Sequence, residues 1–372
     1  MSKFIITGTT GFLGSAIACD LINQGHEVIA LSRNDKKGDK TLKAIYEACM
    51  GYGYSFDASK IKVFDLYSDN LLSELKDHVD SETQFLHSAA HMSYAWKSMG
   101  DAAEFNVSFS TKLLLLARDL GLKSFNYIST LFTSNDYQDV PEEIHLFNHP
   151  QNTYQTSKWF AENQLSLLAN NLEFPIRIFR PGIVIGHSET GWSSCKAFGF
   201  FMFLLGFMQV KSMGKKVINI DLDPEVELPL VCIDDISSWI GQFLESDNYG
   251  FFNLAYNHTK PAQINNLRKL IQNELRIEIN FGGLNTLHDF AFDRKVKLNK
   301  DFAQKIWNFH THKLDSQYGQ RSLDNSSMIK SIAYFVKHYE ADPKKLDVLR
   351  MFRKSKDHVL VVNDFIKNKI KR

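Results

Sequence analysis

Tyr154 and Lys158 form a pair of residues whose types and spacing could do chemistry. They lie four residues apart, so in a helix both side chains project from one face. A free tyrosine has a pKa of about 10, which is too high for proton exchange at neutral pH. A neighbouring ammonium group favours the phenolate and lowers that pKa, so the pair predicts acid–base catalysis.

Thr130 makes this pair more specific, because a Y-x-x-x-K spacing alone is common by chance. It stands 24 residues before Tyr154, at the end of the run 123–130, which predicts a strand. Ligands of open α/β sheets lie at the carboxyl ends of strands. We therefore expect the Thr130 hydroxyl to bind a substrate carbonyl oxygen and to stabilise its developing negative charge. The Lys158 ammonium can in addition hydrogen-bond a nicotinamide ribose.

A glycine-rich turn directly follows the first predicted strand and opens the first predicted helix. Glycine lets the backbone turn tightly and approach a pyrophosphate without a Cβ atom in the way. The helix N-terminus then offers unpaired N–H groups and a positive dipole end. The turn predicts dinucleotide binding, with a purely structural turn as the alternative; it reads Gly8-Thr9-Thr10-Gly11-Phe12-Leu13-Gly14.

Arg33 decides which dinucleotide the sequence favours. NAD-binding chains carry an acidic residue at the end of the second strand to hold the ribose 2′-OH. Here that strand ends Leu31-Ser32-Arg33-Asn34, and a guanidinium pairs well with a 2′-phosphate. The prediction is NADP(H); the alternative is that Arg33 is solvated and Asp35 holds the ribose. Asp65 could bond the adenine amino group, or serve only as a turn residue.

The elements that must position these residues alternate between strands and helices. This alternation predicts βαβ units, a parallel sheet and an α/β, Rossmann-type doubly wound fold. We expect residues 1–180, with 228–255 returning to them, to form the cofactor-binding domain. A smaller, mostly helical substrate-binding region is expected from 181–227 and 256–372. Strands are predicted at 3–7, 27–32, 61–66, 83–90, 123–130 and 175–180, and helices at 15–23, 108–119 and 154–170.

Taken together, these motifs resemble the extended short-chain dehydrogenase/reductase superfamily. The Ser129-Thr130 pair and the run 180–191 look most like its thioester-reductase and fatty acyl-CoA reductase (male-sterility) branch. The resemblance covers about residues 3–255 and is loose beyond them. In chain order its motifs are the glycine turn, Asp65-Leu66, His87-Ser88-Ala89-Ala90, Asn106, Thr130, Tyr154-x-x-x-Lys158 and Arg180-Pro181-Gly182-Ile183-Val184-Ile185-Gly186.

The resemblance implies that Thr130, Tyr154 and Lys158 are catalytic. It implies that Asn106 positions Lys158 through water, although a helix N-cap is an equal reading. His87 is either a titratable residue near the site or a structural histidine at the end of a strand, whereas His91 and His187 are expected to be structural. The residues that the resemblance places at the cofactor are Gly8, Thr10, Gly11, Phe12, Leu13, Gly14, Arg33, Asp65, Leu66, Ser88, Ala89, Ala90, Tyr154, Lys158, Pro181, Gly182 and Ile183.

Phenylalanine occurs 29 times, and five of these residues lie in the window 197–208. Apolar residues on every face predict a buried helix or the wall of an apolar pocket. The alternatives are a core helix, a lid for an acyl, isoprenoid or sterol chain, and a segment that dips into a membrane surface. Lys211, Lys215 and Lys216 could meet a coenzyme A phosphate or an acidic carrier protein, or simply be solvated. The substrate residues we predict are Phe198, Phe201, Met202 and Leu205.

Composition narrows the class of protein further. The formal charge of +1 disfavours a nucleic-acid partner, although residues 342–372 hold ten Lys or Arg against four Asp. Four cysteines without metal-ligand spacing, and no apolar run long enough to span a bilayer, predict a cytoplasmic protein without a metal or transmembrane segment. A homo-oligomer is compatible with the sequence.

The combined prediction is an NADPH-dependent reductase that transfers hydride to a carbonyl or thioester carbon. Its small-molecule substrate is expected to carry an apolar tail, bound to coenzyme A or to an acyl-carrier protein if it is a thioester. Two alternatives use the same scaffold: a hydroxysteroid-type dehydrogenase and a nucleotide-sugar epimerase or oxidoreductase. The third is a protein that senses NADP without catalysis, which the intact Thr130, Tyr154 and Lys158 set disfavours.

Overall fold

The structure is a computed structural model. It describes residues 2–134, 138–147, 149–196, 198–257, 259–300, 303, 305–341 and 364–367, without the side chains of 295 and 297–300. The chain divides into two compact units. The first consists of Met1–Gly182, Val231–Asn257 and Trp307–Arg321, and the second of Ile183–Leu230, His258–Ile306 and Ser322–Arg372. The ranges differ from the predicted domains chiefly at Trp307–Arg321, which belongs to the first unit.

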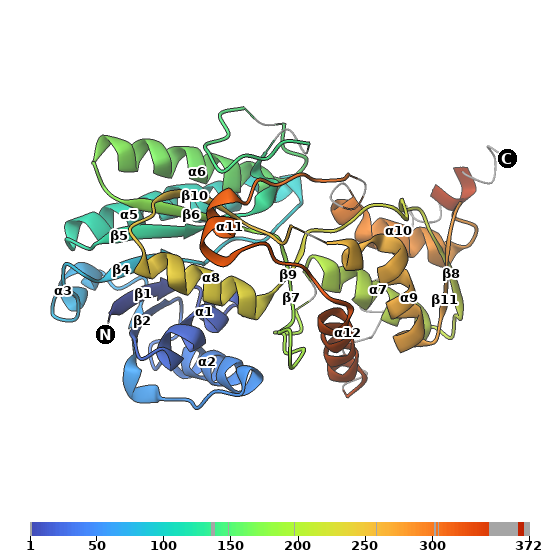
Figure 1. Ribbon diagram of the computed structural model, residues 1–372, viewed down its shortest axis with the longest axis horizontal. Coiled ribbons are helices and arrows are strands. Elements are labelled where there is room, and N and C mark those ends of the chain that lie inside the picture. The colour runs from blue at the N-terminus through green and yellow to red at the C-terminus, as the bar shows by residue number, and fades with distance from the viewer. Residues whose placement is uncertain are drawn as a thin grey trace. The chain divides into compact units, whose positions relative to one another are not determined.

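A seven-stranded parallel sheet forms the centre of the first unit (Figure 1). Its strand order is β10-β6-β5-β4-β1-β2-β3, so the direction of winding reverses between β1 and β4. This is the predicted Rossmann-type α/β fold. The strands are β1 (Lys3–Thr7), β2 (Glu27–Ser32), β3 (Ile61–Asp65), β4 (Gln84–His87), β5 (Ser124–Ile128), β6 (Ile176–Pro181) and β10 (Gly250–Leu254).

The central strands are apolar because helices cover both faces of the sheet. Phe4, Ile5 and Ile6 of β1 have no exposed surface, as expected for a strand buried on two sides. Figure 1 shows α5 and α6 over one face and α1, α2 and α8 over the other. The helical elements of this unit are α1 (Phe12–Asn23), α2 (Asp39–Tyr52), α3 (Leu71–Lys76), α4 (Met99–Ala102), the π-helical turn η3 (Ala103–Ser108), α5 (Phe109–Asp119), α6 (Thr153–Asn171), α8 (Ile233–Glu245), α11 (His312–Tyr318) and the short 3₁₀ turns η1 (Ala58–Lys60), η2 (Trp96–Ser98) and η4 (Leu131–Thr133).

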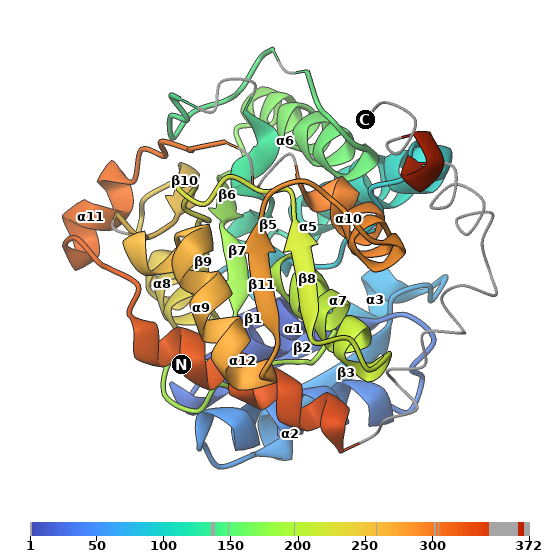
Figure 2. The same cartoon turned by 90° about the vertical axis from the view of Figure 1, so that its right-hand side faces the viewer.

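The second unit is mostly helical, with one small parallel strand pair, β8 (Val217–Ile220) and β11 (Glu278–Phe281). Figure 2 shows its helices gathered around this pair. The strand β11 lies in a region that was predicted to be mostly helical. The helical elements are α7 (Phe200–Ser212), α9 (Ile264–Leu275), α10 (Leu287–Lys300), α12 (Asn325–Glu340) and the 3₁₀ turn η5 (Lys260–Ala262); short strands occur at β7 (Ile183–Ile185) and β9 (Leu230–Cys232).

Asp289 joins α10 to β8 inside the second unit. Its carboxylate accepts hydrogen bonds from the backbone and side-chain nitrogens of Asn219, at 2.9 and 3.1 Å. It also accepts from the backbone nitrogens of Asn285 and Thr286, so it satisfies amides at the start of the helix. Burial raises the pKa of this carboxyl group, but the hydrogen bonds outweigh that effect and hold the pKa below its usual value.

Two kinds of feature, a membrane-spanning helix and a cluster of metal-ligating side chains, are absent from the described residues. None of the helices in these residues is long and apolar enough to cross a membrane. No group of three or more His, Cys, Asp or Glu side chains in them is arranged to hold a metal ion. The basic segment 342–372 lies outside the described residues, apart from 364–367.

Asp20 generates a prediction about stability. It is buried on α1, and burial raises its pKa to about 6, although Gln24 and Ser237 hydrogen-bond it. Because the folded-state pKa lies above the unfolded value, the ionised carboxylate destabilises the folded state as pH rises through this range. We expect Asp20→Asn to raise the free energy of unfolding at pH 8 by about 1–3 kcal/mol, a gain that disappears below about pH 4.

Urea unfolding between pH 4 and pH 8 measures this effect. The control is Asp69→Asn, since Asp69 is exposed and its replacement should leave the pH profile unchanged. The same stability difference at both ends of the pH range would contradict the account.

Candidate active site

The glycine turn between β1 and α1 is built so that only glycine fits at two positions. Gly8 has a φ of +79°, and a Cβ atom there would lie 2.7 Å from the backbone nitrogen of Ala89. A Cβ atom on Gly14 would lie 2.3 Å from the Gly8 carbonyl oxygen. Gly11 is the N-cap residue of α1 and provides no side-chain cap. The helix N-terminus thus presents backbone N–H groups, as a site for a dinucleotide pyrophosphate requires.

Arg33 and Asp35, which follow β2, lie in different environments. Arg33 is exposed, and its guanidinium lies 5.4 Å from the centre of the Phe105 ring. The Asp35 carboxylate accepts hydrogen bonds from the backbone nitrogens of Lys40 and Thr41, at 3.2 and 2.9 Å. Burial alone would raise the pKa of Asp35, but these bonds outweigh it and lower the pKa. Asp35 is therefore engaged at the start of α2, which weakens the alternative that it holds a ribose.

Asp65 and Leu66 tie the end of β3 to its surroundings. The Asp65 carboxylate accepts a hydrogen bond from the backbone nitrogen of Tyr67 at 3.2 Å, as a turn residue does. The backbone nitrogen of Leu66 donates to the carbonyl oxygen of Ser32 at the tip of β2. Both residues are part-buried. This geometry is compatible with a hydrogen bond from Asp65 to the adenine amino group and also with a role for Asp65 as a turn residue only.

His87 is a structural residue at the carboxyl end of β4. One ring nitrogen lies 2.6 Å from the Thr7 hydroxyl, and the other lies 2.9 Å from the Ser110 hydroxyl. Burial, followed by the charge of Lys158, lowers the His87 pKa to about 3, so the ring is neutral. The Thr7 hydroxyl also accepts from the backbone nitrogen of Ala89, at 3.3 Å. The segment Ser88-Ala89-Ala90 is thereby held beside β1, where the winding of the sheet reverses.

Asn106 lies inside the π-helical turn η3 and does not cap a helix. Its side-chain amide donates to the Ser157 hydroxyl on α6 at 2.9 Å and to the His91 carbonyl oxygen at 3.1 Å. Its side-chain oxygen accepts from the backbone nitrogen of His91 at 2.7 Å. Asn106 therefore links the loop after β4 to the helix that carries Tyr154 and Lys158, and the N-cap alternative is wrong.

Thr130, Tyr154 and Lys158 come together at the carboxyl end of β5. The Thr130 side chain lies close enough to Tyr154 to oppose the rise in the pKa of its phenol. The Lys158 ammonium donates to the Ile128 carbonyl oxygen at 2.6 Å and to the Tyr127 hydroxyl at 3.2 Å. It also lies 4.4 Å from the centre of the Tyr127 ring. These contacts explain why Lys158 is only 2% exposed although it carries an amine.

The electrostatics of this group differ from the sequence-based prediction. Burial raises the pKa of Tyr154 above its usual value, whereas we predicted that Lys158 would lower it. The physical reason is that the Lys158 ammonium is bonded to Ile128 and Tyr127 instead. Burial also lowers the pKa of Lys158 to about 7, with Glu162 opposing that change. Tyr154 is thus held as the neutral phenol beside an amine that titrates near neutrality.

A buried ion pair between α6 and β6 was not predicted from the sequence. Arg180 donates two hydrogen bonds to the Glu162 carboxylate, at 2.7 and 3.0 Å, and both side chains are fully buried. The Thr133 hydroxyl donates to the same carboxylate at 3.3 Å. Glu162 follows Lys158 by one helical turn, and this i, i+4 spacing was the available signal. The pair fixes α6 to β6 and to the loop that follows Thr130.

The remaining predicted cofactor residues lie at the end of β6 and directly after it. Pro181 is the last residue of that strand, and the backbone nitrogen of Gly182 donates to the Leu254 carbonyl oxygen at 3.1 Å. These two residues belong to the first unit. Ile183 is the first residue of the second unit and begins β7.

The four predicted substrate residues lie at or beside α7 in the second unit, but outside its apolar cavity. Phe198 is 44% exposed. The Phe201 ring stacks on Phe335 of α12, with centroids 4.8 Å apart and an interplanar angle of 7°. Met202 and Leu205 are part-buried. Lys211 of the same helix pairs with Glu340 at 3.3 Å.

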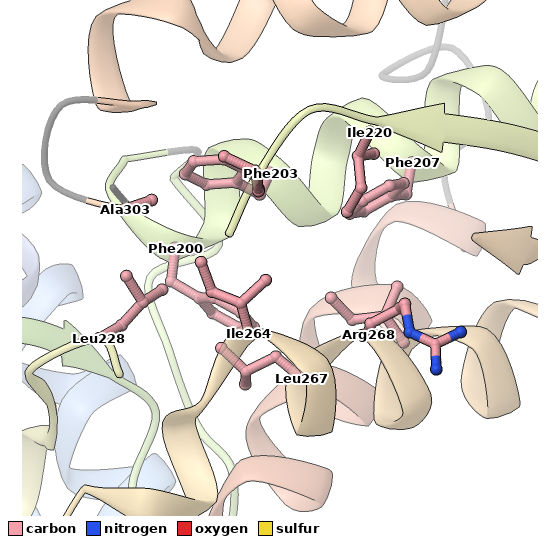
Figure 3. Close-up of a pocket in the computed structure, with 11 residues that line it drawn as sticks. Phe200, Phe203, Phe207, Ile220, Leu228, Ile264, Leu267, Arg268 and Ala303 are labelled. Atoms are coloured by element: carbon pink, nitrogen blue, oxygen red, sulfur yellow. The ribbon is translucent and has the colours of Figure 1, made fainter. Parts of the chain in front are cut away.

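The cavity is lined instead by the neighbouring face of α7 (Figure 3). Its volume is about 40 Å³. In Figure 3 aromatic rings from α7 point toward the aliphatic side chains of α9. An apolar lining of this kind takes an apolar group in preference to water. The lining residues are Phe200, Phe203, Phe207, Ile220, Leu222, Leu228, Ile264, Leu267, Arg268, Ile271 and Ala303.

Comparison with known proteins places the chain in a family. Residues 6–237 match the family model described as Male sterility protein. The chain is 28% identical over 210 residues to the aldehyde reductase lnaA of Aspergillus flavus, covering 51% of this chain and 20% of that protein. It is 26% identical over 242 residues to the nonribosomal peptide synthetase asaC of the same species, covering 58% and 23%. The chain thus spans only about a fifth of the length of these relatives.

Solved structures show the same fold. The terminal R domain from the myxalamid PKS-NRPS biosynthetic pathway superposes with a TM-score of 0.71 at 20% identity, over 91% of each chain. UDP-glucuronic acid 4-epimerase from Bacillus cereus superposes with a TM-score of 0.64 at 18% identity, over 91% of this chain and 100% of that one. Since the family model matches more than half of the residues, the chain belongs to the Male sterility protein family, a thioester-reductase-like branch of the extended short-chain dehydrogenases/reductases.

Proposed function

We propose that the protein is an NADPH-dependent reductase that transfers hydride to a carbonyl or thioester carbon of a substrate with an apolar tail. The observation that carries this proposal is the grouping of Thr130 and Tyr154 with the buried amine of Lys158. It lies at the carboxyl end of a parallel strand, where such sheets bind their ligands.

The cofactor site rests on residues that fit a dinucleotide. Gly8 and Gly14 leave the space that a Cβ atom would fill, and α1 begins without a side-chain cap. Those N–H groups would hold the pyrophosphate. When bound, the reduced nicotinamide supplies the hydride. Lys158 would hydrogen-bond the nicotinamide ribose, and Asn106 would keep the loop after β4 beside α6.

Thr130 and Tyr154 both bind the substrate oxygen in this proposal, and Tyr154 gives the proton. Both hydroxyls can donate to a substrate carbonyl oxygen and stabilise the charge that develops on it. The raised pKa of Tyr154 keeps the phenol protonated, so a proton is available for the oxyanion. Lys158 has a pKa of about 7 in this geometry, so its amine can exchange a proton at neutral pH. For a thioester, the carbon gains the hydride and loses the thiol, which leaves an aldehyde.

The preference for NADPH is supported by the different roles of Arg33 and Asp35. Arg33 is exposed and makes no ion pair within the described part of the chain. A guanidinium carries five N–H donors in one plane and binds a phosphate group through two parallel donors at a time. Asp35 is occupied with the first turn of α2 and offers no free carboxylate to a ribose.

The apolar tail and its carrier are proposed from two separate observations. The second unit contains an apolar cavity with room for about three water-sized volumes. One relative is named an aldehyde reductase and another a nonribosomal peptide synthetase. We therefore propose an acyl chain bound to coenzyme A or to a carrier protein as the substrate class.

An epimerase that acts on nucleotide sugars is the competing function on this fold. NADPH consumption measured against acyl-CoAs, aldehydes and UDP-sugars separates the two. A freely exchanging NADPH that acyl-CoAs or aldehydes oxidise is the expected result. A tightly retained NAD and turnover of UDP-sugars alone would overturn the proposal.

Tyr154→Phe tests the acid–base assignment. Removing the phenol oxygen deletes the proposed proton donor, so kcat should fall by about 10²- to 10⁴-fold. Cofactor binding, measured by nucleotide fluorescence, should be retained. Tyr67→Phe is the matched control, because Tyr67 is 49% exposed. Unchanged turnover in Tyr154→Phe would refute the assignment.

Arg33→Ala tests the 2′-phosphate assignment. The loss of the guanidinium should weaken NADPH binding by at least about tenfold, because a charge-assisted bond is lost, while NADH binding changes little. Titration of each nucleotide by fluorescence measures both dissociation constants. An equal change for the two nucleotides would remove the proposed NADPH preference.

Leu267→Phe tests the cavity. The larger side chain occupies part of the 40 Å³ space, so KM for long-chain substrates should rise about fourfold for each methylene group displaced. Substrates with short chains should be unaffected. Ile329→Phe adds the same ring to an exposed site on α12 and serves as the control. A uniform change in KM over all chain lengths would contradict a tail-binding role.

A further inference from the structure

The π-helical turn η3 presents two consecutive residues to different parts of the proposed cofactor site. Such turns are rare and occur mostly where a functional residue must be aimed. Asn106 bonds the loop after β4 and the helix α6, as described above. Phe105, one residue earlier, lies against Arg33. The proposed roles of Arg33 and Asn106 leave Phe105 without an assigned function.

The Phe105 ring interacts with both Arg33 and His91, and these three side chains are called the stack below. The Arg33 guanidinium carbon lies 5.4 Å from its ring centre. The His91 ring lies nearly parallel to it, with centroids 6.3 Å apart and an interplanar angle of 16°. An arginine placed over an aromatic ring keeps its N–H donors pointing outward in the plane of the guanidinium. Those donors are the ones that a phosphate group uses.

The stack is fixed in place at His91 and not at Arg33. The Asn106 side chain bonds both backbone groups of His91, at 2.7 and 3.1 Å, and so fixes the loop that carries the His91 ring. The same side chain bonds Ser157 on α6 at 2.9 Å. Phe105 therefore sits on a fixed platform, whereas Arg33 is exposed at the tip of β2 and would otherwise sample many rotamers.

We propose that Phe105 is a positioning residue that sets cofactor selectivity through Arg33. Its ring holds the guanidinium flat, so that the donors of Arg33 meet the 2′-phosphate of NADP with less loss of side-chain entropy. This inference rests on the proposed NADPH preference. It predicts that Phe105 contributes to binding of the 2′-phosphate and contributes nothing to the rest of the nucleotide.

The experiment compares adenosine 2′,5′-bisphosphate with adenosine 5′-monophosphate by isothermal titration of the full chain. Phe105→Leu keeps an apolar side chain but removes the ring. It should weaken binding of the bisphosphate about two- to fivefold and leave the monophosphate unchanged. Phe105→Trp keeps an aromatic face, so it should bind the bisphosphate as tightly as the unchanged chain does. In an Arg33→Ala background, Phe105→Leu should have no further effect.

The outcomes separate this inference from the function on which it rests. If Arg33→Ala fails to discriminate between the two nucleotides, the NADPH preference is refuted and the role of Phe105 with it. If Arg33→Ala discriminates but Phe105→Leu weakens both nucleotides equally, Phe105 is a packing residue only and the inference fails alone. An undiminished effect of Phe105→Leu in the Arg33→Ala background would also overturn it.

Discussion

The buried ion pair between Arg180 and Glu162 is the constraint on which the arrangement of Thr130, Tyr154 and Lys158 in the first unit depends. Two fully buried charges are tolerated only when each satisfies the other, and here two hydrogen bonds of the guanidinium reach one carboxylate. The third nitrogen of the guanidinium bonds the Pro141 carbonyl oxygen and a His145 ring nitrogen. Removing one partner of such a pair usually costs about 3–5 kcal/mol. Because Glu162 lies on α6 and Arg180 on β6, the pair sets the position of the helix relative to the sheet. Lys158 and Tyr154 lie within two turns of the same helix.

Burial dominates the electrostatics of this edge. It lowers the pKa of His87 to about 3 and that of Lys158 to about 7, and it raises that of Tyr154. All three effects favour the neutral form of the group, as a site of low polarity does. In the proposed function, a site of this kind would strengthen the hydrogen bonds that Thr130 and Tyr154 offer to a developing negative charge. The same conditions leave His87 to act only as a link between β1, β4 and α5.

Polar side chains that join different elements place the backbone segments at the sheet edge. Thr7 and His87 connect β1, β4 and α5, and Asn106 connects the loop after β4 to α6. The π-helical turn η3 makes the second connection possible, because its extra residue turns Asn106 inward while Phe105 faces Arg33. In the second unit apolar packing takes the place of such polar links, since helix α7 buries aromatic rings on several of its faces.

The sequence by itself determined the Rossmann-type fold, the glycine turn and the grouping of Thr130, Tyr154 and Lys158. These follow from local periodicity and from the rule that parallel strands gather their carboxyl ends at one edge. Only the tertiary structure decided that Lys158 bonds Ile128 and that Glu162 pairs with Arg180, because each partner comes from a distant segment. It also decided which face of α7 lines the cavity. Residues 200, 203 and 207 share that face, but a helix that is apolar all round carries no periodic signal to choose it.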